Sequence, residues 1–238
     1  MFKTAIVNTF VYVGGKLLLT LPIAFMLAFL LSKNTRLNAT GQSIIFTPTI
    51  MSSAVMALIF YLLFNTYNGE INRFLTWLGI IDENVNWLGV KYAMLTCIII
   101  AAWGGIGNYM VYFIAGLTGI STEVYESAKL DGANAAQILF RITISAGPRH
   151  EDDPDVALVI SFMDYQSIMV LTEGGPMNQT NVMFLYIYQL FFPITAGSSV
   201  VQEFGYGAAC SLVAALIIGG VTGLYLILAK RLDAVTGE

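Results

Sequence analysis

Residues 126–132 read Glu-Ser-Ala-Lys-Leu-Asp-Gly, a polar stretch that lies between apolar runs. The residues up to Leu130 favour one short helix and residues 135–141 favour a second, so the pattern predicts two helices that meet at Asp131-Gly132. Gly132 supplies the permissive backbone that such a turn needs. Because the side chains around the turn are small, another protein can approach it closely. This loop is therefore interpreted as a docking element.

The composition indicates a chain that lives in lipid. Hydrophobic residues make up 57% of its 238 residues and charged residues only 11%, and the mean hydropathy is +0.73. A soluble domain carries about 25% charged residues. About 20 apolar residues are enough to cross a bilayer as a helix, so the sequence predicts an all-α polytopic membrane helix bundle. The predicted spans are about 5–31, 43–64, 92–118, 150–172 and 206–229, the fourth having the shortest apolar run (156–172).

The positions of lysine and arginine predict the orientation of these spans. Positively charged residues gather on the cytoplasmic side of membrane proteins. Residues 120–155 are therefore expected to face the cytoplasm, and residues 66–90 and 173–203 the outside, as does the N-terminus. The cytoplasmic clusters are Lys33 with Arg36, then Lys129, Arg141 and Arg149, and finally Lys230 with Arg231.

The spacing E-x-A-x3-G-x9-I from Glu126 to Ile142 resembles the EAA loop of ABC importer permeases. In that family the loop is cytoplasmic and fits a cleft in the ATP-hydrolysing subunit. Residues 172–180, Thr-Glu-Gly-Gly-Pro-Met-Asn-Gln-Thr, resemble the TGGGPxNxT segment of the MalF-like half of sugar importers. Similar likenesses occur at Asn8-Thr9, at residues 86–88 and at residues 204–209, so the resemblance covers nearly the whole chain.

This resemblance implies a type I ABC importer permease core, with residues 1–238 forming a single transmembrane permease domain. It implies a multi-pass protein of a bacterial or archaeal cytoplasmic membrane that moves a mono- or oligosaccharide. The implied partners are membrane lipid, a second, MalG-like permease subunit, two ATP-binding subunits and an extracytoplasmic solute-binding protein, with no nucleic acid. The coupling loop would span residues 120–147, and its assigned residues are Glu126, Ser127, Ala128, Asp131, Gly132 and Ile142. The external loop motif consists of Gly174, Gly175 and Pro176.

The start of the chain differs from the family pattern. Residues 1–9 resemble the stretch that leads into the family's second core helix. The first core helix is therefore expected to be absent from this sequence.

The sequence carries no sign of enzymatic chemistry. Gly14-Gly15-Lys16 lacks the upstream glycine and the hydroxyl residue of a phosphate-binding loop, so ATP and Mg²⁺ are expected on a partner ATPase and no cofactor on this chain. No nucleophile–base arrangement is visible, so no catalytic residue is assigned. The only histidine, His150, has no Cys/His cluster around it, and no metal site is predicted.

Polar residues within the spans are candidates for the solute path, because such residues are costly in lipid. A sugar needs short polar side chains and an aromatic surface. The residues that supply these types are Asp164, Tyr165 and Gln166, together with Asn108 and Tyr109. Hydrogen bonding between helices is the alternative role for each. Lys16, inside the first span, could extend to the outer face or form a pair within the bundle, and pairing or water contact is favoured.

Residues 145–155, Ser-Ala-Gly-Pro-Arg-His-Glu-Asp-Asp-Pro-Asp, depart from the family pattern of Leu-Pro followed by an apolar helix. One interpretation is a genuine acidic insertion. The other is a local reading-frame error, because a one-nucleotide shift permits a proline after Ile144 and an apolar helix start. The frame error is favoured.

Three further alternatives stay open for the function. The chain could be an ABC permease for another solute, such as a polyol or glycerol phosphate. It could be an ion-coupled secondary transporter, although that class has no use for an ATPase docking loop. It could also be a non-functional remnant, given the missing helix and the unusual segment.

Overall fold

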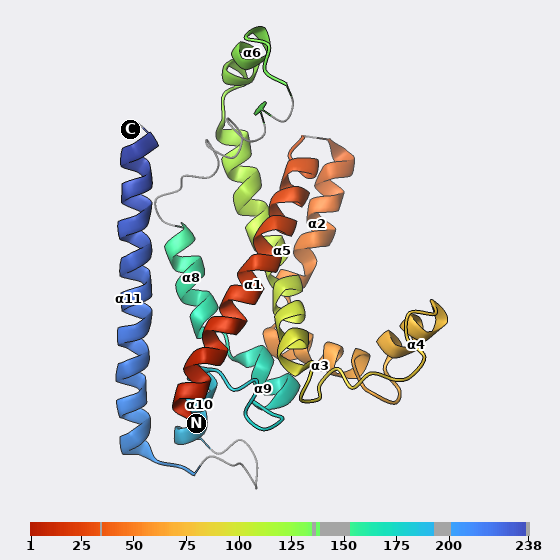
Figure 1. Cartoon of the computed structure of the whole chain (residues 1–238). Helices are drawn as coiled ribbons and strands as arrows, with labels where there is room; N and C mark the ends of the chain where they lie inside the picture. Colours follow the sequence, from red (N-terminus) through yellow and green to blue (C-terminus); the bar gives the residue numbers. More distant parts are fainter. Residues whose placement is uncertain (34, 135–136, 139–152, 193–200, 237–238) are drawn as a thin grey trace. The chain divides into compact units, whose positions relative to one another are not determined.

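The computed structural model describes residues 1–33, 35–134, 137–138, 153–192 and 201–236 (Figure 1). Within these ranges every regular element is a helix, which confirms the predicted all-α class. Three helices coincide with predicted apolar ranges, and each is long and apolar enough to cross a membrane. They are α1 (Phe2–Leu31), α5 (Ala93–Gly119) and α11 (Phe204–Thr236).

The run predicted as one helix over residues 43–64 is broken. It forms the end of α2 (Arg36–Ile50) and the whole of α3 (Ser53–Leu63). Pro48 lies in the last turn of α2, and its carbonyl accepts the Met51 N–H at 3.2 Å. Met51 then adopts an extended backbone (φ −71°, ψ 142°), which ends the helix. Proline lacks the N–H that would continue the helical ladder, so it weakens the run here. Only as a bent pair do the two helices meet the length and hydropathy of one span.

The span predicted over residues 150–172 is also two helices, α8 (Asp153–Met163) and α9 (Gln166–Thr172). Asp164 and Tyr165 lie between them outside any helix. An aspartate opposes the negative C-terminal end of a helix and suits the positive N-terminal end of the next one, so a break at this residue is electrostatically favourable. Residues 139–152 are outside the described part of the chain, and with them Ile142, His150 and most of the acidic segment.

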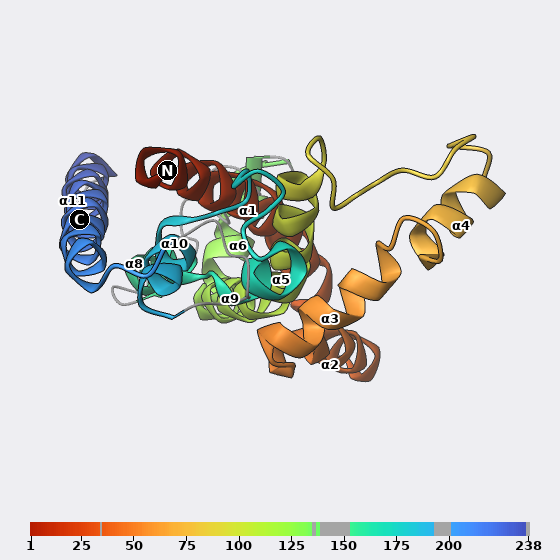
Figure 2. The ribbon, with the colours of Figure 1, turned by 90° about the horizontal axis from the view of Figure 1, so that it is seen from below.

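Two helices were not anticipated from the sequence. The amphipathic α4 (Glu70–Trp77) extends beyond α3 (Figure 2), and α10 (Met183–Phe191) follows the Gly-Gly-Pro segment. Most side chains of α10 are buried, and it packs against α9 and α11, while α9 packs against α3. The region predicted as an external loop over residues 173–203 therefore contains a buried helix.

The chain divides into two compact units, and both α1 and α5 contribute to each. The first unit contains residues 1–16, 53–101 and 152–238, and the second contains residues 17–52 and 102–151.

In the second unit Ala24 and Ala28 of α1 pack with Met110 of α5 in an apolar core. A Cβ on Gly107 would lie 2.7 Å from Thr49 Oγ1 of α2. The missing side chain of Gly107 therefore allows α2 to approach α5 closely.

Candidate functional site

The predicted docking loop begins with helix α6 (Thr122–Leu130), which ends in a Schellman turn. The Ala133 N–H donates to the Ala128 carbonyl at 2.9 Å, the six-residue bond that defines this turn. Gly132 stands at the left-handed position with φ +79°. A side chain at this φ is strained, so the residue type and the turn agree. The predicted end of the first helix before Asp131-Gly132 is confirmed, whereas the predicted second helix over residues 135–141 lies almost wholly outside the described residues.

A reciprocal pair of hydrogen bonds follows the turn. The Asn134 N–H donates to Gln137 Oε1 at 2.9 Å, and the Gln137 N–H donates to Asn134 Oδ1 at 2.8 Å. The Ile138 N–H then bonds to the Asn134 carbonyl at 2.9 Å and closes the first turn. A polar residue followed three positions later by glutamine is a helix-start pattern, so the spacing of Asn134 and Gln137 is a sequence signal for this pair of bonds.

The surface of the loop is open. Leu130 is 89% exposed, and no atom of the described chain lies within 4 Å of a Cβ built on Gly132. An apolar side chain fully in water beside a rigid turn suits contact with another molecule. The remaining described residues assigned to the loop are also accessible: Glu126, Ser127 and Asp131 are exposed and Ala128 is half-buried.

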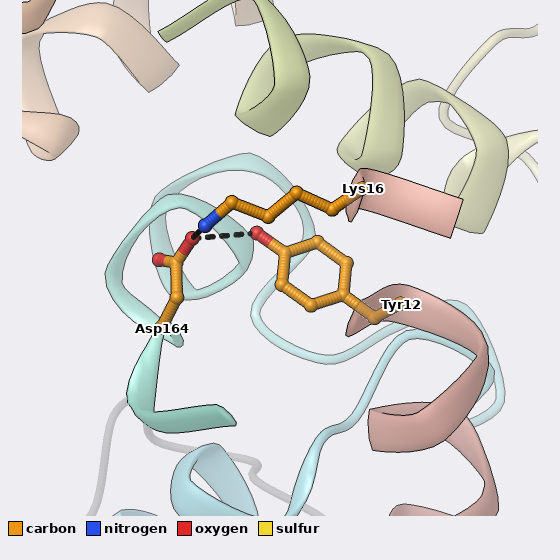
Figure 3. Close-up of polar contacts among 3 residues, drawn as sticks. All are labelled: Tyr12, Lys16 and Asp164. Carbon is orange, nitrogen blue, oxygen red and sulfur yellow. Dashed lines mark hydrogen bonds and ion pairs between the residues drawn. The ribbon is translucent and has the colours of Figure 1, made fainter. Parts of the chain in front are cut away.

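A charged cluster joins the start of the chain to the break between α8 and α9 (Figure 3). Lys16 Nζ lies 2.7 Å from Asp164 Oδ2, and the Tyr12 hydroxyl donates to the same oxygen at 3.0 Å. Tyr12 and Lys16 are one helical turn apart on α1, so their side chains reach the carboxylate from the same face. Tyr12 is fully buried, and the Lys16 and Asp164 side chains are 10% and 17% exposed.

This cluster shows which group pairs with Lys16. An isolated charge within a membrane span is expensive, and a partner within hydrogen-bond reach offsets part of that cost. The predicted pairing of Lys16 within the bundle is confirmed. Asp164, which is predicted in the solute path, thus has two partners inside the chain. These contacts agree with the alternative prediction, in which Asp164 forms hydrogen bonds between helices. Its role toward a solute stays a prediction.

The other residues predicted in the solute path have separate surroundings. Tyr165 is half-buried and its ring lies 5.6 Å from that of Tyr188, while Gln166 is exposed at the start of α9. Asn108 is exposed on α5, and Tyr109 is half-buried there. These two residues belong to the second unit, whereas residues 164–166 belong to the first.

The Gly-Gly-Pro segment after α9 forms a loop with its own hydrogen-bond network, called here the glycine–proline loop (residues 172–181). Gly174 has φ +85°, and the Gly175–Pro176 peptide is cis. The buried Thr180 hydroxyl bonds to the Gly175 carbonyl at 2.6 Å and to the Thr172 hydroxyl at 2.7 Å. Thr180 therefore holds the two ends of the loop together.

Two residues of α1 anchor this loop. Asn8 Nδ2 donates to the carbonyls of Asn178 and Asn181, each at 3.0 Å. Thr9 Oγ1 accepts the Met183 N–H at 2.8 Å and donates to the Ala5 carbonyl. The sequence pattern included Asn8-Thr9 without assigning it a role. The tertiary contacts show that the pair positions the glycine–proline loop and the start of α10.

Comparisons with known proteins agree with this architecture. The family of binding-protein-dependent transport system inner membrane components matches residues 20–146. The arabinooligosaccharides transport system permease protein AraP of Bacillus subtilis is 30% identical over 91% of this chain and 68% of its own length. The lactose transport system permease protein LacF of Rhizobium radiobacter is 28% identical over 97% of this chain and 77% of its own length.

The fold also matches a solved structure. A crystal structure of a bacterial ABC transporter involved in the import of the acidic polysaccharide alginate matches with a TM-score of 0.80 and 22% identity, over 96% of this chain and 78% of that one. The family match covers more than half of the chain, and the apolar helices fit a bacterial membrane. The chain therefore belongs to the family of inner-membrane components of binding-protein-dependent transport systems, and it is a transport permease.

Proposed function

We propose that this chain is the membrane-spanning permease subunit of an ABC importer that moves a sugar across the cytoplasmic membrane. The observation that carries the proposal is the loop at residues 120–138. Helix α6, a glycine turn and the reciprocal Asn134–Gln137 hydrogen bonds form there, with Leu130 exposed beside the turn. A preformed helical turn with an open apolar side chain can transmit the motion of a bound ATPase to α5, which directly precedes it in the chain.

The names of the relatives support a carbohydrate as the solute. The two permeases described above are named for arabinooligosaccharides and for lactose. A polyol or glycerol phosphate remains the alternative within the same class. An ion-coupled mechanism is disfavoured, because the family works with binding proteins.

The partners follow from the same assignment. The chain would assemble with a second permease subunit, two ATP-binding subunits and an extracytoplasmic solute-binding protein. ATP and Mg²⁺ would be held by the ATP-binding subunits, since this sequence has no phosphate-binding loop. Residues 120–155 would face the cytoplasm.

The solute path is proposed to include Tyr165, whose half-buried ring stacks near Tyr188. An aromatic surface suits the apolar face of a sugar ring. The change Tyr165→Ala should weaken uptake in a complex that still assembles and still hydrolyses ATP. Failed assembly, or unchanged uptake of every sugar tried, would contradict this role.

The test of the whole assignment is Gly132→Trp, with Gly132→Ala as its matched control. Both variants place a side chain at a left-handed backbone position, so they share the same strain. Only tryptophan adds bulk to the open surface, where nothing in the described chain would meet it. Gly132→Trp should abolish uptake and solute-stimulated ATPase activity together, whereas Gly132→Ala should retain most of both.

Two measurements complete this test. Co-purification of ATP-binding subunits with the wild-type chain should be lost in Gly132→Trp, while both variants still insert in the membrane. A cysteine at position 134 should resist an impermeant reagent in intact cells. Normal transport by Gly132→Trp would remove the docking role, and strong labelling at position 134 would reverse the proposed orientation.

A further inference from the structure

A pocket of about 390 Å³ lies in the first unit, beside the glycine–proline loop. Three segments line it: the end of α3 with the turn after it, the loop before α5, and the end of α9 with the loop that follows. The volume is within the range of small-molecule sites in proteins, about 300–1,000 Å³. The lining residues that matter here are Tyr61, Asn65, Thr66, Asn86, Thr172 and Pro176.

The lining is polar without charge. The described residues that form it include no Asp, Glu, Lys or Arg. They offer amide and hydroxyl groups beside the ring of Tyr61. No hydrogen bond within the described part of the chain engages the Asn86 amide, the Thr66 hydroxyl or the Tyr61 hydroxyl. Neutral donors and acceptors beside an aromatic ring match a neutral polyhydroxylated ligand, whereas a phosphate or carboxylate would need a positive partner.

One buried residue holds two of the three walls together. Asn72 is 2% exposed, and its Nδ2 donates to the carbonyls of Thr66 and Val85 at 3.1 and 3.0 Å. Its Oδ1 accepts the Val85 N–H at 3.3 Å and the Trp87 indole N–H at 2.8 Å. The Asn72 side chain therefore joins the turn before α4, through one hydrogen bond, to the loop before α5, through three.

The third wall is equally constrained. Thr172 is bonded to Ile168 and Thr180, and the glycine–proline loop is anchored on α1 by Asn8. In the first wall, Asn65 Oδ1 accepts hydrogen bonds from the N–H groups of Tyr67 and Asn68. The backbone of the walls is therefore held in place before a ligand arrives, and a preorganised site loses less entropy on binding.

We infer that this pocket is a binding subsite for one ring of a neutral sugar on the extracytoplasmic side of the permease. The inference rests on the proposed function and on the predicted outward orientation of residues 66–90 and 173–203. Asn86 and Thr66 hydrogen-bond to the sugar hydroxyls, and Tyr61 supplies the aromatic surface. The subsite receives solute before it enters the membrane path, and it selects against anionic solutes because it has no cation to pair with them.

The experiment measures direct sugar binding to the assembled transporter without its solute-binding protein, by saturation-transfer NMR. The probes are lactose and a neutral arabinooligosaccharide, with an alginate oligosaccharide as the anionic counterpart. The test variant is Asn86→Leu, and its matched control is Asn84→Leu, an exposed asparagine two residues away that does not line the pocket. Thr66→Val, which removes a hydroxyl with little change of shape, is a second test variant should Asn86→Leu fail to assemble.

Wild-type transporter and Asn84→Leu should bind a neutral sugar equally, and both should bind the anionic one more weakly. Asn86→Leu and Thr66→Val should each raise the dissociation constant about fivefold, the effect of one lost hydrogen bond. Uptake is measured in parallel. If the wild type imports sugars but binds none here, or if the pocket variants bind as the wild type does, the subsite is wrong and the proposed function stands. If the wild type imports only non-carbohydrate solutes, the proposed function fails and the subsite with it.

Discussion

The loop after α6 and the glycine–proline loop after α9 begin with similar backbone hydrogen bonds, but their surroundings differ. Both helices end with a bond spanning six residues, from Ala133 N–H to the Ala128 carbonyl in one and from Glu173 N–H to the Ile168 carbonyl in the other. Both place a glycine at positive φ two residues after the last helical residue, at +79° for Gly132, which lies within the bonded turn, and at +85° for Gly174, which follows it.

The surroundings of the two glycines separate the loops. No atom of the described residues lies within 4 Å of a Cβ on Gly132, whereas a Cβ on Gly174 would lie 3.0 Å from the Asn181 side chain. Asn181 in turn donates to Gln189 Oε1 at 2.8 Å, and Gln189 Nε2 donates to the Glu173 carbonyl at 3.0 Å. The same local turn thus serves an open surface in one place and a packed frame in the other, and only the neighbours decide which.

The largest loss of stability is expected at the mostly buried Lys16–Asp164 pair. Lys16→Met should lower the free energy of unfolding by about 3 kcal/mol, because it leaves Asp164 unpaired in a mostly buried position. The control is Arg73→Met, which breaks the Arg73–Glu70 pair. That pair is as short, at 2.6 Å, but its side chains are 71% and 64% exposed, so its loss should cost under about 1 kcal/mol.

Thermal unfolding of both variants in the assembled transporter gives the comparison. The double variant Lys16→Met/Asp164→Leu should recover much of the lost stability, because it removes both charges at once. Equal losses in Lys16→Met and Arg73→Met would show that the cluster in Figure 3 is not a buried pair.

The anchor of the glycine–proline loop should give the next largest effect. Asn8→Ala removes two hydrogen bonds to loop carbonyls and should cost about 2 kcal/mol of stability. Asn38→Ala, which removes one solvent-exposed hydrogen bond to the Lys33 carbonyl, should cost clearly less. Limited proteolysis within residues 172–181 should increase only in Asn8→Ala. Unchanged protection there would contradict the anchoring role.

Alanine at the two turn glycines tests the comparison directly. Each substitution strains a left-handed backbone by about 1 kcal/mol. Gly174→Ala should cost roughly 1 kcal/mol more than Gly132→Ala, because only its methyl group meets a neighbour. The unfolding midpoints of the two variants check this difference, and identical midpoints would mean that Asn181 moves aside freely.

The smallest effect on stability should occur at the exposed turn. Leu130→Glu should change the free energy of unfolding by no more than about 0.5 kcal/mol, since the side chain is already in water. Uptake should nevertheless fall strongly, because the apolar contact with the ATPase is lost. Leu37→Glu, at an equally exposed leucine of α2, should leave uptake nearly unchanged. Loss of uptake in both variants would mean that exposure alone, and not the docking loop, explains the effect.

Local sequence determined the elements that depend on composition and short spacing. The lipid environment follows from the low content of charged residues. Long apolar runs predicted α1 and α5 to within a few residues and the start of α11 to within two, although α11 continues to Thr236. The turn at Gly132 was predictable because a left-handed backbone position favours one residue type. The family pattern in the loops pointed to the docking segment and to the glycine–proline loop before any coordinates.

Tertiary structure decided the rest. The breaks at Met51 and at Asp164 occur where Pro48 and Asp164 interrupt apolar runs, but membrane helices also tolerate such residues, so the sequence alone could not locate the breaks. Asp164 meets Tyr12 and Lys16 across about 150 residues of sequence, and Asn8 meets its loop across a still longer separation. Such pairings carry no local signal, because the sequence around a polar residue in an apolar run does not differ when its partner is a solute, water or another helix. Only the folded structure shows which group the side chain contacts.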